Sequence, residues 1–370
     1  MKVLVMGGTR FNGLALVRDL WEHGHEVTTF NRGVTEAHLP KGVRRLLGDR
    51  TDRSALTEMM KKEDFDVVQD ISGYTRDDVQ PLFDAFKGRI GHYIFAGSTV
   101  IYADTDILPI RETSTLDEGP KQGDYGKNKI AVERWLFGEH RENGFPASVM
   151  SFSMVFGPNN GQEREQRMFA RLLAGRPVMI PGDGTAVGQI GHVEDEATAL
   201  RMMMRNSNTF GKRYNITGKD QYTDEGYVDV FADILGVTPQ KVFIPAQLMD
   251  DMCDDKFRLE RATPAASARP AGSTGPAQNP QTQQSNISLM NSIIQRLNPQ
   301  IHRWNKNVYF SIDAMREDFS FTPKYTFHTA VEQTYEWYLR EGRDKSNVYD
   351  WSFEDQLLEK VRSMTGGGAK

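Results

Sequence analysis

The chain has 370 residues and a formal net charge of −5, a size that suits one large or two ordinary domains. No run approaches the ~18 consecutive apolar residues that span a membrane, and the acidic balance argues against a general nucleic-acid binder. Cys253 is the single cysteine, which excludes an intrachain disulfide and a cysteine-based metal site. The first residues lead directly into a strand, so we expect no signal peptide and a protein of the reducing cytoplasm.

The N-terminal stretch predicts a strand, a glycine-rich loop, a helix and a second strand. Residues 1–6 are mostly apolar, residues 14–23 have helical spacing, and residues 27–30 form the second strand. In this arrangement a pyrophosphate can lie on the first helical turn, because glycines let it approach the unpaired N–H groups. We therefore predict a dinucleotide site; the alternative is a tight turn that binds no ligand. The predicted contacts are Gly7, Gly8, Thr9, Arg10, Phe11, Asn12 and Gly13.

The end of the second strand bears on the choice of cofactor. Chains of this fold that bind NAD carry an acid there, which holds the ribose hydroxyls. This chain has Asn31 and Arg32 instead, and Arg10 is close enough in sequence to serve the same place. A cation at this point suits a 2′-phosphate, so we predict NADP, with NAD as the alternative. The other interpretation of both arginines is that they are solvated surface charges.

Strands and helices continue to alternate, which predicts an α/β fold with a doubly wound parallel sheet of the Rossmann type. The expected strands are 43–47, 65–70, 92–96 and 147–152, and the expected helices are 54–62, 76–86 and 124–136. In such sheets ligands bind at the carboxyl ends of the strands. Asp49, Ser72, Gly73 and Ser98 all lie at such ends, so we assign them to the site.

The domain organisation is expected to be interleaved. Residues 1–155, with 189–217 returning to them, should form the Rossmann domain, and residues 156–188 and 218–370 a smaller C-terminal substrate domain. Residues 262–285 are rich in Pro, Ala, Gly, Ser, Thr and Gln and show no apolar period, which predicts a disordered loop. The alternative is a surface loop ordered by a partner subunit.

Three residues carry the predicted chemistry. Tyr125 and Lys129 are four residues apart and share one helix face, and Ser98 ends the preceding strand. A phenol has a pKa of about 10, which a neighbouring ammonium lowers, and a lysine can also hold the nicotinamide ribose. A serine hydroxyl orients the substrate oxygen. Together they suit proton transfer at a carbinol while hydride moves to or from a nicotinamide. The alternative for Tyr125 is a surface aromatic residue at a helix start.

These motifs resemble the extended short-chain dehydrogenase/reductase superfamily, or NAD-dependent epimerase/dehydratase group. Within it the sequence is similar to the GGTRF-x-G branch, which includes the chloroplast stem-loop RNA-binding proteins. The matching segments are residues 7–13, 30–33, 175–182, 191–195, 214–216 and 350–353. The resemblance implies that Ser98, Tyr125 and Lys129 are the catalytic trio, that Tyr125 and Lys129 also contact the cofactor, and that Asp49 lies near the adenine. It also implies a homodimer paired through the helix that carries Tyr125.

Departures from the relatives narrow the activity. The chloroplast proteins lack the catalytic tyrosine, so Tyr125 favours an enzyme. Dehydratases have an Asp-Glu pair where this chain has Thr99 and Val100, and nucleotide-sugar epimerases usually have an arginine at Gly188 and an asparagine at Met154. We expect hydride transfer at a secondary hydroxyl of a sugar, nucleotide-sugar or sugar-like metabolite, serving epimerisation. The alternatives are an NADPH-dependent ketoreductase and, in another class, an RNA-binding protein of the chloroplast stem-loop type.

The substrate site is expected to draw on residues from several loops. The candidates are Tyr74, Thr99, Ser153, Met154, Asn159, Arg164 and Gln189. Arg164 would serve a phosphate, although a solvated helix face is the other interpretation. Asp104, Asp106, Glu194 and Asp195 lack metal-ligand spacing, so no metal is expected.

Overall fold

The computed structural model describes residues 1–120, 122–254, 256–259 and 304–366. The predicted loop at 262–285 lies outside this part of the chain. The chain divides into two compact units, each described by itself below. The first comprises Met1–Gly161, Gln189–Asp220 and Tyr309–Phe327, and the second Gln162–Gly188, Gln221–Val308 and His328–Lys370. Residues 309–327, which the sequence analysis assigned to the substrate domain, therefore belong to the first unit.

The first unit is built on a seven-stranded parallel sheet of order β11-β6-β5-β4-β1-β2-β3, which confirms the predicted fold class. Its strands are β1 (Lys2–Met6), β2 (Glu26–Asn31), β3 (Arg44–Leu47), β4 (Val67–Asp70), β5 (His92–Ser98), β6 (Ala147–Phe152) and β11 (Arg213–Ile216). The order reverses beside β1, so the carboxyl ends of β1 and β4 flank the switch point where ligands bind in such sheets.

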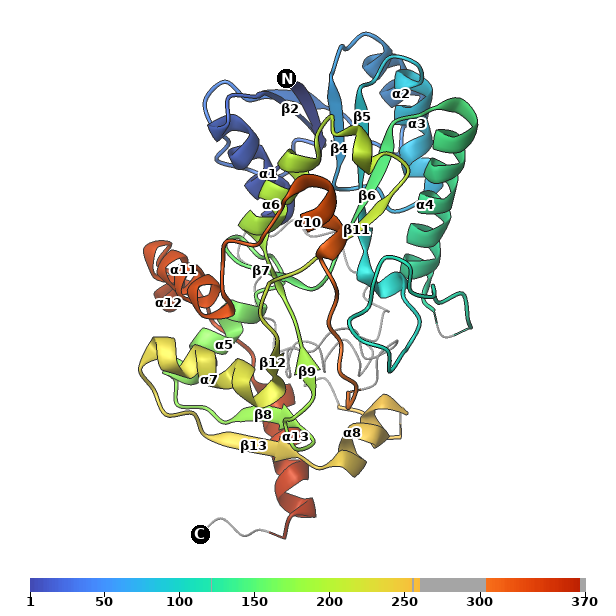
Figure 1. Cartoon of the computed structure of the whole chain (residues 1–370). Helices are drawn as coiled ribbons and strands as arrows, with labels where there is room; N and C mark the ends of the chain where they lie inside the picture. Colours follow the sequence, from blue (N-terminus) through green and yellow to red (C-terminus); the bar gives the residue numbers. More distant parts are fainter. Residues whose placement is uncertain (121, 255, 260–303, 367–370) are drawn as a thin grey trace. The chain divides into compact units, whose positions relative to one another are not determined.

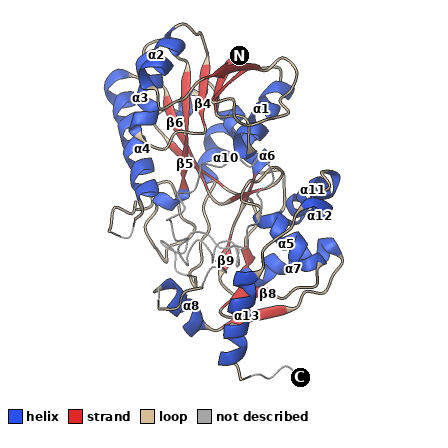
Figure 2. Ribbon diagram, turned by 180° about the vertical axis from the view of Figure 1, so that it is seen from behind, coloured by secondary structure: helices blue, strands red, loops and turns tan. Residues whose placement is uncertain are grey.

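Helices cover both faces of this sheet (Figures 1 and 2). One face carries α1 (Phe11–Glu22), α6 (Val193–Met203) and α10 (Asp313–Phe319), and the other α2 (Arg53–Lys61), α3 (Arg76–Phe86) and α4 (Asp124–Asn143). Strand β1 shows why two cores form, because successive side chains point to opposite faces. Val3 and Val5 enter one buried cluster, and Leu4 and Met6 enter the other.

The short helix α10 explains why the chain returns to the first unit. Met315 is fully buried in the core that lies beneath α1 and α6. The backbone carbonyl of Asp318 accepts a hydrogen bond from Asn206 Nδ2 (3.2 Å), and Ile110 N donates to Tyr309 O (2.9 Å). The unit also contains the parallel pair β7 (Val155–Phe156) and β10 (Gly191–His192), and the 3₁₀ turns η1 (Thr99–Ile101) and η2 (Ser207–Thr209).

The described residues of the second unit form two small strand pairs. Strands β8 (Val178–Pro181) and β13 (Lys241–Ile244) are parallel, and β9 (Val187–Gly188) and β12 (Tyr222–Thr223) are antiparallel. Its helices are α5 (Arg164–Leu173), α7 (Asp224–Leu235), α8 (Ala246–Cys253), most of α11 (Phe327–Arg340), α12 (Arg343–Ser346) and α13 (Ser352–Met364). Buried Glu354 pairs with Arg167 and Arg171 at 3.0 Å each, which ties α13 to α5.

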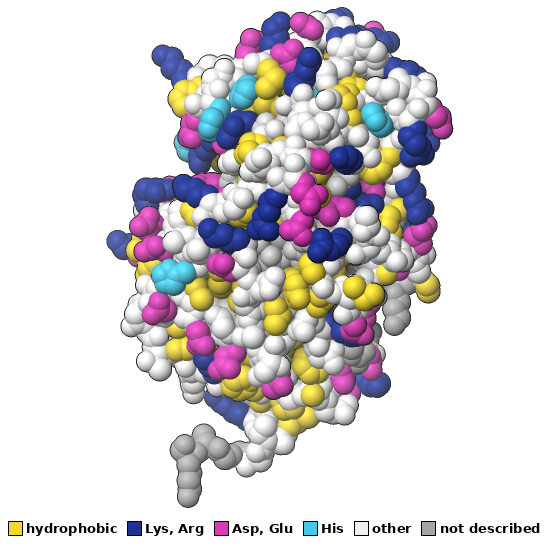
Figure 3. Space-filling view, viewed as in Figure 1, with side chains coloured by type: hydrophobic (Ala, Val, Ile, Leu, Met, Phe, Trp, Pro, Cys, Tyr) yellow, Lys and Arg dark blue, Asp and Glu magenta, His cyan; other side chains and the backbone are white. Residues whose placement is uncertain are grey.

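The surface carries charges of both signs. On the face drawn in Figure 3, Lys and Arg side chains stand among Asp and Glu side chains. Among the residues that the structure describes, no helix combines the length and the apolar character needed to cross a bilayer.

Candidate active site

The glycine loop between β1 and α1 depends on close backbone contact. Gly7 and Gly8 have φ values of +109° and +88°, where side chains are disfavoured. A Cβ on Gly8 would lie 2.8 Å from Thr29 Cγ2, and a Cβ on Gly13 would lie 2.6 Å from Gly8 N. Because these glycines have no side chains, the loop and the start of α1 can lie in close contact.

The start of α1 has the electrostatic character of an anion site. Its first turn contains no acidic residue, and the N-cap residue Arg10 makes no side-chain capping bond. The backbone N–H groups of the first turn and the positive end of the helix dipole can therefore receive a phosphate group. These features fit a dinucleotide, whose pyrophosphate needs both the close approach and the donors.

The end of β2 carries cations and no acid. The side-chain oxygen of Asn31 accepts a hydrogen bond from Arg45 Nη2 (3.1 Å), and Arg32 is exposed beside it. We did not predict a role for Arg45, which lies on β3. The parallel register of β2 and β3 places it opposite Thr29. Two arginines thus stand where NAD-binding chains of this fold carry a carboxylate.

Asp49, the residue expected near the adenine, is exposed after β3. Its carboxylate accepts hydrogen bonds from the backbone N–H (2.9 Å) and the hydroxyl (2.8 Å) of Thr51. These bonds lower the pKa of Asp49, and the charge of Arg32 adds to the effect. Asp49 is therefore an anion at neutral pH.

A buried ion pair lies at the carboxyl end of β4. Arg50 binds Asp70 through both terminal guanidinium nitrogens, Nη1 to Oδ1 at 3.0 Å and Nη2 to Oδ2 at 2.9 Å. The carboxylate also accepts from the Tyr93 hydroxyl (2.7 Å) and from the backbone N–H groups of Ser72 (3.3 Å) and Gly73 (2.9 Å). Burial alone would raise the pKa of Asp70, but Arg50 and the hydrogen bonds lower it. Asp70 is thus a fully buried carboxylate.

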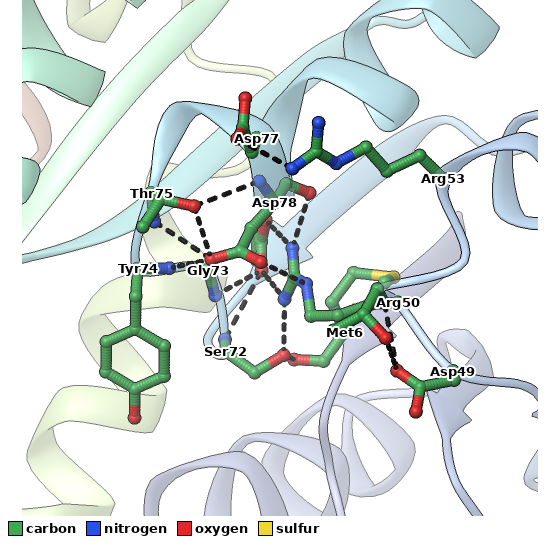
Figure 4. Close-up of polar contacts among 12 residues, drawn as sticks. Met6, Asp49, Arg50, Arg53, Ser72, Gly73, Tyr74, Thr75, Asp77 and Asp78 are labelled. Carbon is green, nitrogen blue, oxygen red and sulfur yellow. Dashed lines mark hydrogen bonds and ion pairs between the residues drawn. The ribbon is translucent and has the colours of Figure 1, made fainter.

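The same arginine fixes the loop that follows β4 (Figure 4). Arg50 donates to the Ser72 hydroxyl (2.7 Å) and to the backbone carbonyl of Asp78 (2.9 Å). Asp78 Oδ2 accepts from the backbone N–H groups of Tyr74 (3.0 Å) and Thr75 (2.9 Å), completing a capping box at the start of α3. Sequence reasoning assigned Ser72 to the site but missed Arg50 and Asp78. The signal for Asp78 was the capping-box spacing from Thr75, and the only signal for Arg50 was its place after the strand-end Asp49.

Lys129 reaches this loop from α4. Its ammonium donates to the carbonyls of Gly73 (2.7 Å) and Ala96 (2.6 Å), and the residue is 4% exposed. Burial lowers the pKa of Lys129 to about 8, although the charge of Asp70 opposes this change. At neutral pH most of the lysine therefore keeps its proton.

Tyr125 and Ser98 lie beside this lysine. The Tyr125 ring is 45% exposed, with its centroid 5.6 Å from Lys129 Nζ and 5.9 Å from the Tyr74 ring. Ser98 is buried at the end of β5, and its hydroxyl accepts from Val100 N at 3.4 Å. The structure thus brings the three residues of the predicted trio together.

The environment of Tyr125 differs from the expectation that Lys129 lowers its pKa. The phenol's surroundings raise that pKa, by burial first, with the Ser98 hydroxyl opposing and Tyr74 adding to the rise. The reason is geometric, because the carbonyls of Gly73 and Ala96 already receive the Lys129 ammonium.

The substrate candidates have different surroundings. Tyr74 is 55% exposed, whereas Thr99, Ser153 and Met154 are buried. Asn159 has a φ of +66°, in the left-handed region that asparagine tolerates.

The two remaining substrate candidates are Gln189 and Arg164. The amide of Gln189 binds the backbone at both ends, donating to Gly218 O (2.6 Å) and accepting from Phe310 N (2.9 Å), so the fold uses it. Arg164 begins α5 in the second unit.

Comparison with known proteins identifies the relatives. The chain is 34% identical over 238 residues to the chloroplast stem-loop binding protein of 41 kDa b of Arabidopsis thaliana, a match that covers 61% of each chain and thus less than two thirds of that relative. It is 25% identical over 259 residues to the 2′-dehydrokanamycin reductase of Streptomyces kanamyceticus, covering 69% of this chain and 72% of the other.

Solved structures share the fold. The UDP-glucose 4-epimerase of Thermotoga maritima superposes with a TM-score of 0.67 at 16% identity, over 92% of this chain and 99% of the other. Residues 3–217 match the sequence model of the NAD dependent epimerase/dehydratase family. This match confirms the resemblance drawn from the motifs: the chain belongs to the NAD dependent epimerase/dehydratase family, within the extended short-chain dehydrogenase/reductase superfamily.

Proposed function

We propose that the chain is an NAD(P)-dependent enzyme that transfers hydride at a secondary hydroxyl of a sugar or sugar-like metabolite, in the course of an epimerisation. The observation that carries the proposal is the proximity of Ser98, Tyr125 and Lys129 at the carboxyl ends of the strands. The related proteins include UDP-glucose 4-epimerases and a reductase of a sugar-containing compound, which supports a sugar-like substrate.

In this proposal each residue has one task. The nicotinamide supplies the hydride acceptor and donor. Ser98 orients the substrate oxygen, and Tyr125 exchanges a proton with that oxygen. Lys129 has three N–H donors, of which two bind carbonyls, so one is left for the ribose of the cofactor. The first turn of α1 holds the pyrophosphate through its backbone N–H groups.

A ketoreductase is the second candidate, favoured by the state of Tyr125. A phenol of ordinary pKa is protonated at neutral pH, and the surroundings of Tyr125 shift its pKa further in the same direction. A protonated phenol suits donation to a ketone oxygen. A substrate screen that follows reduced cofactor and deuterium incorporation together separates the two reactions. Net consumption of cofactor indicates a reductase, and isomer formation without consumption indicates an epimerase.

The Tyr125→Phe variant tests the shared chemistry. It removes the hydroxyl and keeps the ring, so turnover should fall about 10²- to 10⁴-fold. The variant should still bind the cofactor, measured by calorimetry, because Lys129 and the glycine loop after β1 remain unchanged. A fully active Tyr125→Phe enzyme would refute the proposed function.

We propose NADP as the cofactor, on the evidence of Arg32 and Arg45 beside Asn31. Arg32→Ala should weaken NADP binding about tenfold, which corresponds to about 1.4 kcal/mol, and leave NAD binding unchanged. Calorimetric titration with both cofactors measures this, with Arg141→Ala on the exposed surface of α4 as the control. Tighter binding of NAD, or an unchanged affinity for NADP in Arg32→Ala, would contradict the assignment.

RNA binding of the chloroplast type remains the candidate of another class. It rests on the name of one relative, and the acidic net charge gives it no support. Filter binding against salt is the discriminating assay, because phosphate contacts produce a steep loss of affinity with rising salt.

A further inference from the structure

One peptide connects the buried Arg50–Asp70 pair to the lysine of the trio. The N–H of Gly73 donates to Asp70 Oδ1 (2.9 Å), and the carbonyl of the same residue accepts from Lys129 Nζ (2.7 Å). A Cβ on Gly73 would lie 2.8 Å from Asp70 Oδ2, so this turn is pressed onto the carboxylate. A movement of the Asp70 carboxylate would therefore also move the Gly73 carbonyl, which accepts the hydrogen bond from Lys129.

The second acceptor of Lys129 belongs to the adjacent strand. Ala96 lies on β5, which pairs with β4 so that Asp70 stands opposite Phe95. The ammonium also lies 4.5 Å from the centroid of the Phe95 ring, which excludes water on that side. Ala96 and Phe95 thus hold the lysine from strand β5. Asp70 fixes its other acceptor, the Gly73 carbonyl in the loop after β4.

Charged and titratable groups face Lys129 from every element packed around it. Asp70 at the end of β4 and Asp78 on α3 favour its charged form, and Arg50 disfavours it. Tyr74 and Tyr125 contribute their rings, with centroids 5.1 and 5.6 Å from Nζ. Without Asp70, the buried lysine would face the Arg50 cation with its main counter-charge removed.

In the proposed function Lys129 binds the ribose of the cofactor, whereas Asp70 and Arg50 have no assigned role. We propose that Asp70, held by Arg50, is a positioning residue for Lys129: it fixes the Gly73 carbonyl that receives the ammonium and supplies the negative charge that keeps the lysine protonated. This inference rests on the proposed function, in which Lys129 serves the site. Arg50 in turn stabilises the Asp70 carboxylate, which would otherwise be an uncompensated buried charge.

The decisive variant is Asp70→Asn, which keeps the shape of the side chain and removes its charge. The titration of Lys129 is followed by NMR on protein labelled with carbon-13 at the lysine Cε, and the signal is identified by its absence in Lys129→Arg. The midpoint should move down by about one pH unit or more. The alkaline limb of the pH profile of kcat/KM should move by the same amount in the same direction.

Two matched variants separate this effect from general disturbance. Tyr93→Phe removes one hydrogen bond to the same carboxylate but keeps its charge, and Asp77→Asn removes an exposed charge on α3 that pairs with Arg53. In both, the Lys129 titration should stay at the wild-type value. An unchanged titration in folded Asp70→Asn, or an equal shift in Asp77→Asn, would overturn the proposal.

If Asp70→Asn fails to fold, Gly73→Ala tests the same connection without changing any charge. The added methyl group pushes the turn away from the carboxylate, so Lys129 loses its acceptor and its titration should again move to lower pH. An unchanged titration there overturns the positioning role. The NMR readout needs no substrate, so a fully active Tyr125→Phe enzyme refutes the proposed function while the Lys129 titration still decides the role of Asp70.

Discussion

The contact between Gly13 and Gly8 makes a quantitative prediction about cofactor binding. In a Gly13→Ala variant the new Cβ would lie 2.6 Å from Gly8 N and 2.9 Å from Gly8 Cα. Ordinary contact begins at about 3.5 Å, so the helix start and the loop must separate by about 0.9 Å. Such overpacking costs about 1–3 kcal/mol, and the higher helix preference of alanine returns about 1 kcal/mol. The free energy of unfolding should therefore fall by no more than about 2 kcal/mol.

Cofactor binding should suffer more than stability, because the displaced atoms are the N–H donors of the loop. We expect the Kd for NADP, measured by calorimetry, to rise at least about tenfold, or about 1.4 kcal/mol. The matched control is Gly138→Ala in α4, where the new Cβ would meet only Arg141 Nη2 at 3.9 Å. That variant should gain about 0.5–1 kcal/mol in urea unfolding and keep the wild-type Kd. A Gly13→Ala protein that binds NADP as the wild type does would refute the assignment of the loop.

Two further predictions concern buried titratable groups. Burial raises the pKa of Glu196. The contribution of its protonated carboxyl to the free energy of unfolding is therefore fully present below the unfolded pKa of about 4.3 and is lost as the pH rises toward and through the folded pKa. Glu196→Gln should therefore be more stable than the wild type at pH 7 and equal to it near pH 4 in chemical unfolding, whereas the exposed control Glu142→Gln should show no such crossover. Burial lowers the pKa of His92 to about 3, so its contribution is present above the unfolded value of about 6.5 and is lost as the pH falls. His92→Gln should remove up to about 1.4 kcal/mol per pH unit of the stability loss between pH 6 and 4, and His38→Gln, at an exposed position, should remove none.

The features that follow from local sequence were predictable. Alternating apolar strands and helices predicted the parallel sheet, and the N-terminal stretch predicted the order of β1, the glycine loop, α1 and β2. The four-residue spacing of Tyr125 and Lys129 placed both on one helix, next to the end of β5. These relations depend on neighbours in the chain or on strand periodicity.

The hydrogen-bond network around Asp70 could not be predicted from sequence neighbours or strand periodicity. Arg50 follows β3 and Asp70 ends β4, and these strands are not adjacent, since β1 and β2 lie between them in the sheet. Their contact depends on how two loops curve over the strand ends, which no sequence period encodes. The contacts of Gln189 were likewise not predictable, because its amide is engaged by the backbone of residues 218 and 310, both distant in sequence.

The return of residues 309–327 to the sheet unit has a consequence for biosynthesis. Met315 completes a core whose other members come from residues 3–216 and from Ile312 and Phe321. During translation the sheet segments leave the ribosome long before this helix does, so the face beneath α1 and α6 stays partly uncovered until residues 162–188 and 221–308 of the second unit have been synthesised. A nascent chain that stops at residue 308 would therefore expose apolar surface to chaperones, and the sheet unit would mature only near the end of synthesis.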